Sequence, residues 1–315
     1  MNKLETAEGY RKTPLFFTKK TGRAGYMLYK KKAPLAAFLL PGFIMLFIFL
    51  YIPFVDNIRN SLYNMKGFVE LQKFIGLSNY QEMLQDAKLH TALINSLKMM
   101  VLTVVFQVGI ALILAVLVNN IKKGQQLFRT VYFFPIVISA TAIGLLFNLF
   151  YNYNGGALNQ ILEAAGKEPV NWLGASTALI MIVIPTIWSY VGFYFVIILT
   201  GLCDISEDIY EAAAIDGCNK SQAVFRITLP LLRGVICTCI TLAVTGALKV
   251  FDLPWVIAPQ GAPGGITHFM GTYMYQMTFV NLNVDYGAAI AVVIVALGVA
   301  VSLIINKILK PDENL

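Results

Sequence analysis

Six long runs of this sequence contain no Asp, Glu, Lys or Arg, and these runs most constrain what the chain can fold into. They are 33–55, 99–121, 130–162, 169–203, 234–248 and 286–306. A helix that crosses the hydrocarbon core of a membrane needs about 20 apolar residues, and all but one of the runs exceed that length. The exception, 234–248, continues beyond Lys249 to Ile257. The runs therefore predict a polytopic membrane protein.

Two other fold classes fit these runs poorly. A transmembrane β-barrel needs strands in which apolar and polar residues alternate, whereas these runs are apolar on every face. The buried helices of a soluble protein do not supply six such runs in one chain. We expect an all-α chain whose transmembrane domain covers 34–310. Its six spans are expected at about 34–56, 92–121, 127–151, 176–202, 231–257 and 285–309.

Prolines lie inside several expected spans. Pro41, Pro53, Pro135 and Pro185 each remove one helix hydrogen bond and favour a kink. Such a kink can be a simple bend, or it can mark a broken helix beside a translocation path. The sequence leaves both interpretations open.

Basic residues beside the first expected span indicate its orientation. Residues 1–33 carry nine Lys and Arg, and cytoplasmic flanks of membrane spans are enriched in both. We expect cytoplasmic N- and C-termini, a basic cytoplasmic segment at 1–33 and no removable signal peptide. The net charge of +7 is then a signal of topology, and nucleic acid is not an expected partner.

The segment 204–230, between the fourth and fifth expected spans, is too polar to cross the membrane. Asp204 followed by Glu207 is typical of a helix start, and apolar residues then recur at helical spacing. Gly217 can end this helix, because glycine adopts the left-handed conformation without strain. A second helix is expected at about 221–229. The pattern predicts a helix–glycine–helix unit suited to a partner's groove.

A long motif in this segment resembles a known family. Glu211-Ala212-Ala213-Ala214-Ile215-Asp216-Gly217, followed by Phe225, Ile227, Leu229 and Pro230, closely resembles the EAA loop of permease subunits of ABC importers. Cys218 stands where that family usually has Ala. Five more segments are similar to maltose-type carbohydrate permeases: Phe74–Tyr80, Arg129 with Pro135, Gly156–Asn159, Trp172–Gly174 and Lys249–Asp252. The resemblance covers about residues 35–310.

The resemblance implies a type I importer fold in the bacterial cytoplasmic membrane and the import of a sugar. It implies a second homologous permease subunit, a pair of ATPase subunits and an extracytoplasmic solute-binding protein as partners. The chain has no G-x-x-x-x-G-K-[ST] phosphate loop, so ATP hydrolysis is expected in a partner, and no cofactor is expected. The residues implied to dock on the ATPase are Glu211, Ala212, Ala213, Asp216 and Gly217.

Residues that contact a sugar can be sought by chemistry alone. Sugars present hydroxyl groups and flat apolar faces, which suit side-chain amides and aromatic rings. The candidates within the spans are Gln107, Asn148, Trp188, Tyr190 and Tyr194. Lys249 and Asp252 are ionisable residues within the fifth span, three residues apart. We expect them to form a structural ion pair on one helix face or to act as a gate.

Other functional classes receive less support. A secondary transporter would favour an inverted repeat and ionisable residues at the membrane midplane, and we find neither pattern. A membrane-embedded enzyme would carry a catalytic motif of known type, and the sequence has none. The four cysteines lack the spacing of a metal site. An ABC permease for a non-sugar solute remains an alternative.

Overall fold

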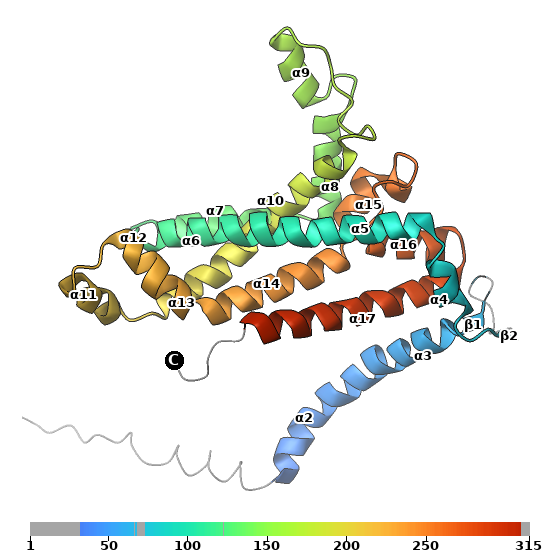
Figure 1. Ribbon diagram of the computed structural model, residues 1–315, viewed down its shortest axis with the longest axis horizontal. Helices are drawn as coiled ribbons and strands as arrows, with labels where there is room; N and C mark the ends of the chain where they lie inside the picture. Colours follow the sequence, from blue (N-terminus) through green and yellow to red (C-terminus); the bar gives the residue numbers. More distant parts are fainter. Residues whose placement is uncertain (1–31, 66, 68–72, 122, 310–315) are drawn as a thin grey trace, which may run out of the picture. The chain divides into compact units, whose positions relative to one another are not determined.

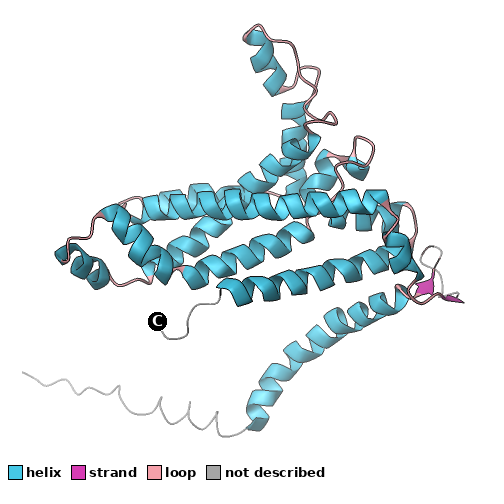
Figure 2. Cartoon of the chain, viewed as in Figure 1, coloured by secondary structure: helices cyan, strands magenta, loops and turns pink. Residues whose placement is uncertain are grey.

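The computed structural model describes residues 32–65, 67, 73–121 and 123–309, most of them helical (Figures 1 and 2). The basic segment predicted at 1–33 therefore lies almost entirely outside the described residues. The chain divides into two units, residues 1–56 and 57–315, which are described separately.

Among its described residues, the first unit contains one apolar helix. It consists of α2 (Lys32–Leu46), the π-helical segment η1 (Phe47–Tyr51) and most of α3 (Ile52–Asn60), whose last turn enters the second unit. Together these segments form a helix, Pro34–Asn60, that is long and apolar enough to cross a membrane. Pro41 lies inside α2 without ending it, so this proline does not break the span.

In its described part, the second unit holds four more helices that are long and apolar enough to span a membrane. They are α5–η2–α6 (Ala87–Leu102, Thr103–Val108, Gly109–Asn119), α10 (Ala178–Cys203), α14–α15 (Arg233–Leu248, Asp252–Ile257) and α17 (Val284–Leu309). A bent pair, α7 (Gln125–Val137) and α8 (Ala140–Tyr151), makes a sixth span if it is counted as one. The all-α architecture predicted from the apolar runs is confirmed.

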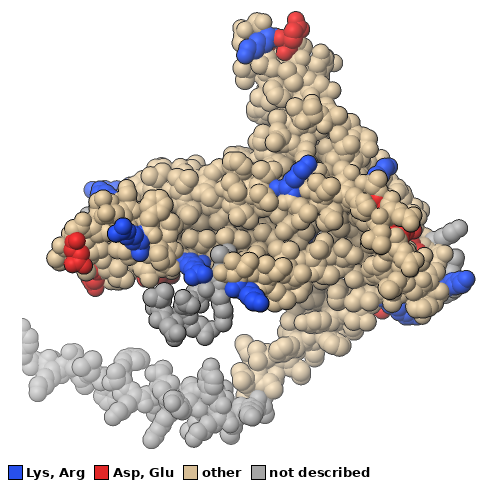
Figure 3. Space-filling model, viewed as in Figure 1, with Lys and Arg blue, Asp and Glu red and all other residues tan. Residues whose placement is uncertain are grey.

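Shorter elements connect the spans at their two ends (Figure 1). At one end are α11 (Glu207–Ile215), α12 (Lys220–Ala223), η3 (Val224–Thr228) and α13 (Leu229–Leu231). At the other are β1 (Tyr63–Asn64), its antiparallel partner β2 (Lys73–Phe74), α4 (Ser78–Met83), η4 (Pro259–Gly261), α16 (Met270–Tyr275) and η5 (Gln276–Val280). The helix α9 (Ala157–Ala164) follows α8. In Figure 3, charged side chains gather at these ends and at the tip of the projection that carries α9, and few lie on the face between the two ends.

The expected third span, 127–151, is not a straight helix. It bends by 88° between α7 and α8. Pro135 lies inside α7, Ile138 is extended (φ −75°, ψ 138°), and the Ser139 hydroxyl accepts a hydrogen bond from the Ala142 amide at 3.2 Å, which caps α8. Of the two interpretations that the sequence left open, the broken helix applies at Pro135.

The helix α10 is the most buried of the spans. It packs against α6, α7, η2 and α14. Phe195, Ile198 and Leu199 on this helix are fully buried. At Gly192 the backbone of α10 approaches α7 so closely that an added Cβ would overlap the Tyr132 carbonyl oxygen. Small residues permit such close helix contacts in membranes, where burial of apolar area gives little drive for association.

A carboxylate joins three helices at the α4–α16 end. Asp86 caps α5: its Oδ1 accepts from the amides of Lys88 and Leu89 at 2.9 and 3.1 Å. Its Oδ2 accepts from the hydroxyls of Tyr273 on α16 and Tyr286 on α17, both at 2.7 Å. Burial acts to raise the pKa of Asp86, but these four hydrogen bonds outweigh it and lower the pKa below its usual value.

We predict that Gly192→Ala destabilises the protein, because the added methyl group forces α7 and α10 apart. Overpacking of this kind costs about 1–3 kcal/mol. Thermal unfolding of the purified chain in detergent measures the effect. Gly109→Ala is the matched control, since nothing lies within 4 Å of its added Cβ, and it should leave the transition unchanged or raise it. Equal transitions in the two variants would contradict the close helix contact.

We predict that Asp86→Asn lowers stability at neutral pH by about 1–3 kcal/mol, because two tyrosine hydroxyls lose a charged acceptor while the helix cap persists. The folded-state pKa of Asp86 lies below its unfolded value, so the stabilisation is present above about pH 4 and is lost as the pH falls further.

The measurement for Asp86→Asn is detergent unfolding of wild type and variant between pH 7 and pH 3. Burial, aided by the charge of Lys88, lowers the pKa of the nearby His268 to about 4, so protonation of this ring also destabilises the fold in acid. Both proteins share that effect, and their difference isolates Asp86. A difference that stays constant with pH would contradict the prediction.

Candidate functional site

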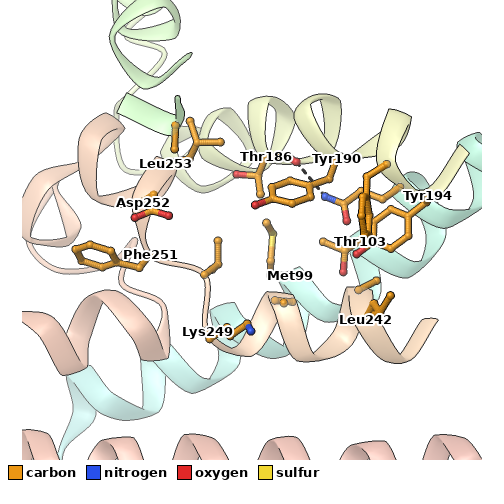
Figure 4. A pocket seen from close by; sticks show the side chains of 17 residues that line it. Met99, Thr103, Thr186, Tyr190, Tyr194, Leu242, Lys249, Phe251, Asp252 and Leu253 are labelled. Atoms are coloured by element: carbon orange, nitrogen blue, oxygen red, sulfur yellow. Dashed lines mark hydrogen bonds between the residues drawn. The ribbon is translucent and has the colours of Figure 1, made fainter. Parts of the chain in front are cut away.

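A cavity of about 500 Å³ lies among the spans of the second unit (Figure 4). Its walls come from α5 and η2, from the middle of α10, from the second half of α14, from the segment that joins α14 to α15, and from the starts of α8 and α15. The residues that matter for its chemistry are Thr103, Gln107, Thr186, Tyr190, Tyr194, Lys249, Phe251 and Asp252, with Met99, Leu242 and Leu253 among the apolar ones. The cavity is thus a mostly apolar chamber with a few polar groups, as small-molecule sites commonly are.

A π-helical segment supplies the amide of the cavity. Thr103 and Gln107 begin and nearly end η2 (Thr103–Val108), and π-helical turns are frequent at functional sites. The Gln107 Nε2 donates to the Thr186 carbonyl on α10 at 3.0 Å. Its Oε1 has no hydrogen-bond partner among the described residues. Gln107 therefore links two spans, and its Oε1 remains available as a hydrogen-bond acceptor.

Tyr190 gives the cavity an aromatic surface. It extends from α10 above Met99 in Figure 4 and is 43% exposed. Tyr194, one turn further along, also lines the cavity but is buried, and its ring packs against Phe193 with centroids 5.2 Å apart. Three of the five sequence-predicted solute residues, Gln107, Tyr190 and Tyr194, therefore share this cavity.

The other two solute candidates lie outside the cavity lining. Asn148 on α8 donates its Nδ2 to the Val256 carbonyl on α15 at 3.1 Å, which is a structural contact between helices. The Trp188 ring contacts Phe147 with centroids 5.9 Å apart. Sequence reasoning missed Thr103 and Thr186, although each lies four residues before a candidate, Gln107 or Tyr190, and hence on the same helix face.

Lys249 and Asp252 both line the cavity, but in the described chain no ion pair joins them. The helix breaks between them: α14 ends at Leu248, and α15 begins at Asp252 after Phe251, whose backbone is not helical (φ −140°, ψ −58°). The expected pairing on one helix face therefore does not occur. Instead Lys249 follows the C-terminus of α14 and Asp252 opens α15, so each charge opposes the partial charge of its own helix end.

The loop 204–230 forms two short helical stretches. Ser206, rather than Asp204, caps α11, because its hydroxyl accepts from the Asp208 amide at 3.3 Å. Gly217 ends α11 with φ +79°. The amides of Cys218 and Gly217 donate to the carbonyls of Ala213 and Ala214 at 2.9 and 3.1 Å, the two bonds of a Schellman motif. The predicted glycine end of the helix is confirmed.

The second stretch is continuous from α12 through η3 to α13. Asn219 and Gln222 form a reciprocal capping box at its start. The hydroxyls of Tyr210 on α11 and Thr228 on η3 lie 3.0 Å apart in a hydrogen bond, which ties the two stretches together. The helix α11 buries none of its residues in this chain. Ile215 and Phe225 are 87% and 71% exposed.

Among the described residues, no three His, Cys, Asp or Glu side chains come together as a metal site. The Glu211, Ala212, Asp216 and Gly217 positions of the EAA-like motif are all exposed, and Ala213 is half-buried. The two sets of sequence-predicted residues are thus separate: five of the seven path and gate residues line the cavity, and the coupling residues lie on α11 or directly follow it.

Comparison with known proteins agrees with this geometry. Residues 107–314 match the family described as binding-protein-dependent transport system inner membrane component. The chain belongs to this family. It is therefore a multi-pass inner-membrane component of a binding-protein-dependent transport system, as the EAA-like motif and the apolar runs predicted. Membership removes the alternatives of a secondary transporter and a membrane enzyme.

Three similar proteins illustrate the family. The Bacillus subtilis protein named Probable ABC transporter permease protein YurN is 36% identical over 88% of this chain and 96% of its own length. The arabinooligosaccharides transport system permease protein AraP of Bacillus subtilis is 30% identical over 90% of both chains. A bacterial alginate ABC transporter, solved in complex with alginate pentasaccharide-bound periplasmic protein, contains a chain with TM-score 0.79 and 22% identity, over 90% of this chain and 96% of that one. This last likeness concerns the fold.

Proposed function

We propose that this chain is the permease subunit of an importer for a sugar or oligosaccharide and forms half of its translocation path. The chemistry of the cavity carries the proposal. The Tyr190 ring, the Gln107 amide and the separated charges of Lys249 and Asp252 line one chamber. Rings suit the apolar faces of a sugar, and amides and charged groups suit its hydroxyls.

Named relatives support the same class of solute. AraP is named for arabinooligosaccharides, and the structural neighbour belongs to an alginate transporter in complex with a pentasaccharide-bound periplasmic protein. We propose that a separate extracytoplasmic solute-binding protein delivers the sugar to this chain. A second homologous permease subunit supplies the other half of the path.

The loop end of the molecule is assigned to an ATPase dimer. Ile215 and Phe225 are large apolar side chains that are exposed at this end of the molecule, outside the spans, where a partner surface can cover them. They lie close in sequence to the exposed residues Glu211, Asp216 and Gly217. In this proposal α11 docks in a cleft of an ATPase subunit, and the loop lies in the cytoplasm, on the same side as the basic segment 1–33.

The connection from α11 to the cavity gives the coupling a physical route. Tyr210 and Thr228 link α11 to η3, and η3 continues through α13 into α14, whose residues Leu242 and Gly246 line the cavity. ATP drives the change from inward-facing to outward-facing by favouring one conformation of the ATPase dimer over the other. Lys249 and Asp252, at the break after α14, are assigned to the gate.

We predict that Glu211→Lys and Gly217→Pro abolish solute uptake while the protein still inserts. Reversing a charge at a docking surface lowers affinity by more than about tenfold. Proline cannot adopt φ +79° and removes the amide that caps α11. The measurements are uptake in cells carrying the complete transporter, immunoblots of the membrane fraction, and co-purification of the ATPase subunit.

Two control variants sharpen this test. Glu163→Lys reverses an exposed charge on α9, and Gly217→Asn keeps a residue that tolerates the left-handed conformation; both should transport normally. Wild-type uptake should stop when ATP is depleted while ion gradients are held. Normal uptake in Glu211→Lys and Gly217→Pro would remove the proposed coupling role.

We predict that Tyr190→Leu raises the half-saturating sugar concentration by about tenfold, because the cavity loses an aromatic surface and a hydroxyl. Trp188→Leu is the matched control: the two residues lie on α10, are equally exposed at 43%, and only Tyr190 lines the cavity. Uptake of labelled arabino-oligosaccharides and alginate oligosaccharides is the measurement. Equal effects of the two substitutions would contradict the assignment of the path.

A further inference from the structure

Four aromatic rings form a continuous strip that begins at the cavity. Phe251 lines the cavity, and in Figure 4 its ring points away from Tyr190, past Asp252. It stacks on Trp255 at 5.7 Å between centroids with a 25° interplanar angle, and it lies 4.6 Å from Tyr275. Tyr275 in turn contacts Trp255 at 4.8 Å and Phe279 at 4.9 Å. We call these four residues the aromatic strip.

The strip is not part of the buried core. Phe251, Trp255 and Tyr275 are half-buried, and Phe279 is 52% exposed. The rings come from α15, α16 and η5 and from the non-helical residue before α15, all at the end of the spans away from α11. A ligand that approaches the cavity from this end therefore passes the strip.

Two polar groups on the strip have no hydrogen-bond partner among the described residues. Buried Trp and Tyr usually find a hydrogen-bond partner for their polar atom. Two such groups in this chain do: the Trp172 Nε1 donates to the Asn159 Oδ1 at 2.9 Å, and the Tyr273 hydroxyl donates to Asp86 at 2.7 Å. Within the described part of the chain, the Trp255 Nε1 and the Tyr275 hydroxyl have no such partner.

Ring faces together with free donors match the chemistry of saccharides, which offer apolar C–H faces and hydroxyl acceptors. We infer that the aromatic strip is a second saccharide-contact site, outside the cavity, for the sugar units of an oligosaccharide that project beyond it. A cavity of about 500 Å³ belongs to the size class that holds one drug-sized ligand, so a longer saccharide has units outside it, and Phe251 joins the cavity lining to the strip. This inference rests on the proposed sugar transport.

The strip should therefore govern selectivity for chain length. Trp255→Leu and Tyr275→Phe should raise the half-saturating concentration for tri- to pentasaccharides by about tenfold and about threefold, respectively. Uptake of the matching monosaccharide should change little, because a single unit fits inside the cavity. The measurement is competition by unlabelled arabino-oligosaccharides and alginate oligosaccharides of increasing length against a labelled trisaccharide, in cells carrying the complete transporter.

Matched control variants separate a direct contact with the saccharide from an effect on the packing of the helices. Tyr273→Phe removes a hydroxyl that is bound to Asp86, and Trp188→Leu removes an aromatic ring outside both the strip and the cavity. Neither should alter length selectivity. If Trp255→Leu fails to insert, Tyr275→Phe still tests the inference, since it removes one oxygen atom from a group without a partner.

The outcomes distinguish failure of the aromatic strip from failure of the proposed sugar import. A loss confined to longer saccharides supports the strip. Loss that is equal for all lengths, or no loss in Tyr275→Phe, would show that the rings only hold α15 against α16 or form an aromatic belt at the membrane interface, and would overturn the inference while leaving sugar import intact. A wild-type transporter that takes up no saccharide would overturn the proposed function, and the strip with it.

Discussion

A backbone N–H or C=O group without a partner in hydrocarbon costs several kcal/mol, and this cost governs where the spans of this protein can depart from regular helix. At the α4–α16 end, the Asn95 Nδ2 donates to the carbonyls of Ile266 and His268 at 2.7 and 3.0 Å. Ser96 accepts from the Met270 amide at 2.9 Å. Side chains of α5 thus satisfy a non-helical segment that leads into α16, so irregular chain can pack beside the spans.

The same cost explains why polar residues within the spans are ambiguous signals. Gln107 and Asn148 are both uncharged amides in apolar helices, and each donates to a carbonyl on another helix. Gln107 also borders the cavity, whereas Asn148 does not. The difference depends on which helix faces which, and this is decided by packing between segments that lie far apart in the chain. Residue type and helical spacing therefore identify the candidates without ranking them.

Local chemistry predicts the parts of the site whose partners are close in sequence. The left-handed end of α11 at Gly217 depends only on neighbouring backbone groups. The resemblance of the surrounding motif to the EAA loop led to the correct family. The capping residue was misassigned by two positions, because Asp204 and Ser206 both carry an acceptor of the right kind, and only the observed backbone, extended at Ser206, selects between them.

The two helix breaks could not be predicted, and each has a physical reason. Pro135 and Pro185 are both prolines inside apolar runs, and the sequence predicts a kink equally at each. Of these two helices, only the one that contains Pro135 breaks, because Ser139 can cap a new helix there. The helix α10 continues through Pro185. Lys249 and Asp252 were expected on one helix face. A break that places each charge at its own helix end gives both a favourable dipole interaction, and the sequence pattern is equally compatible with either arrangement.

The break after α14 also matters for motion. Below the break, α14 continues from α13 and η3, to which α11 is tied by Tyr210 and Thr228. Above it, α15 packs on α8 and receives the Asn148 hydrogen bond. A rigid helix through residues 249–251 would carry any displacement of α14 directly into α15. With the helix interrupted there, α14 can shift the cavity wall at Leu242 and Gly246 while α15 keeps its contacts with α8, so the wall at Leu242 and the wall at Leu253 need not move together.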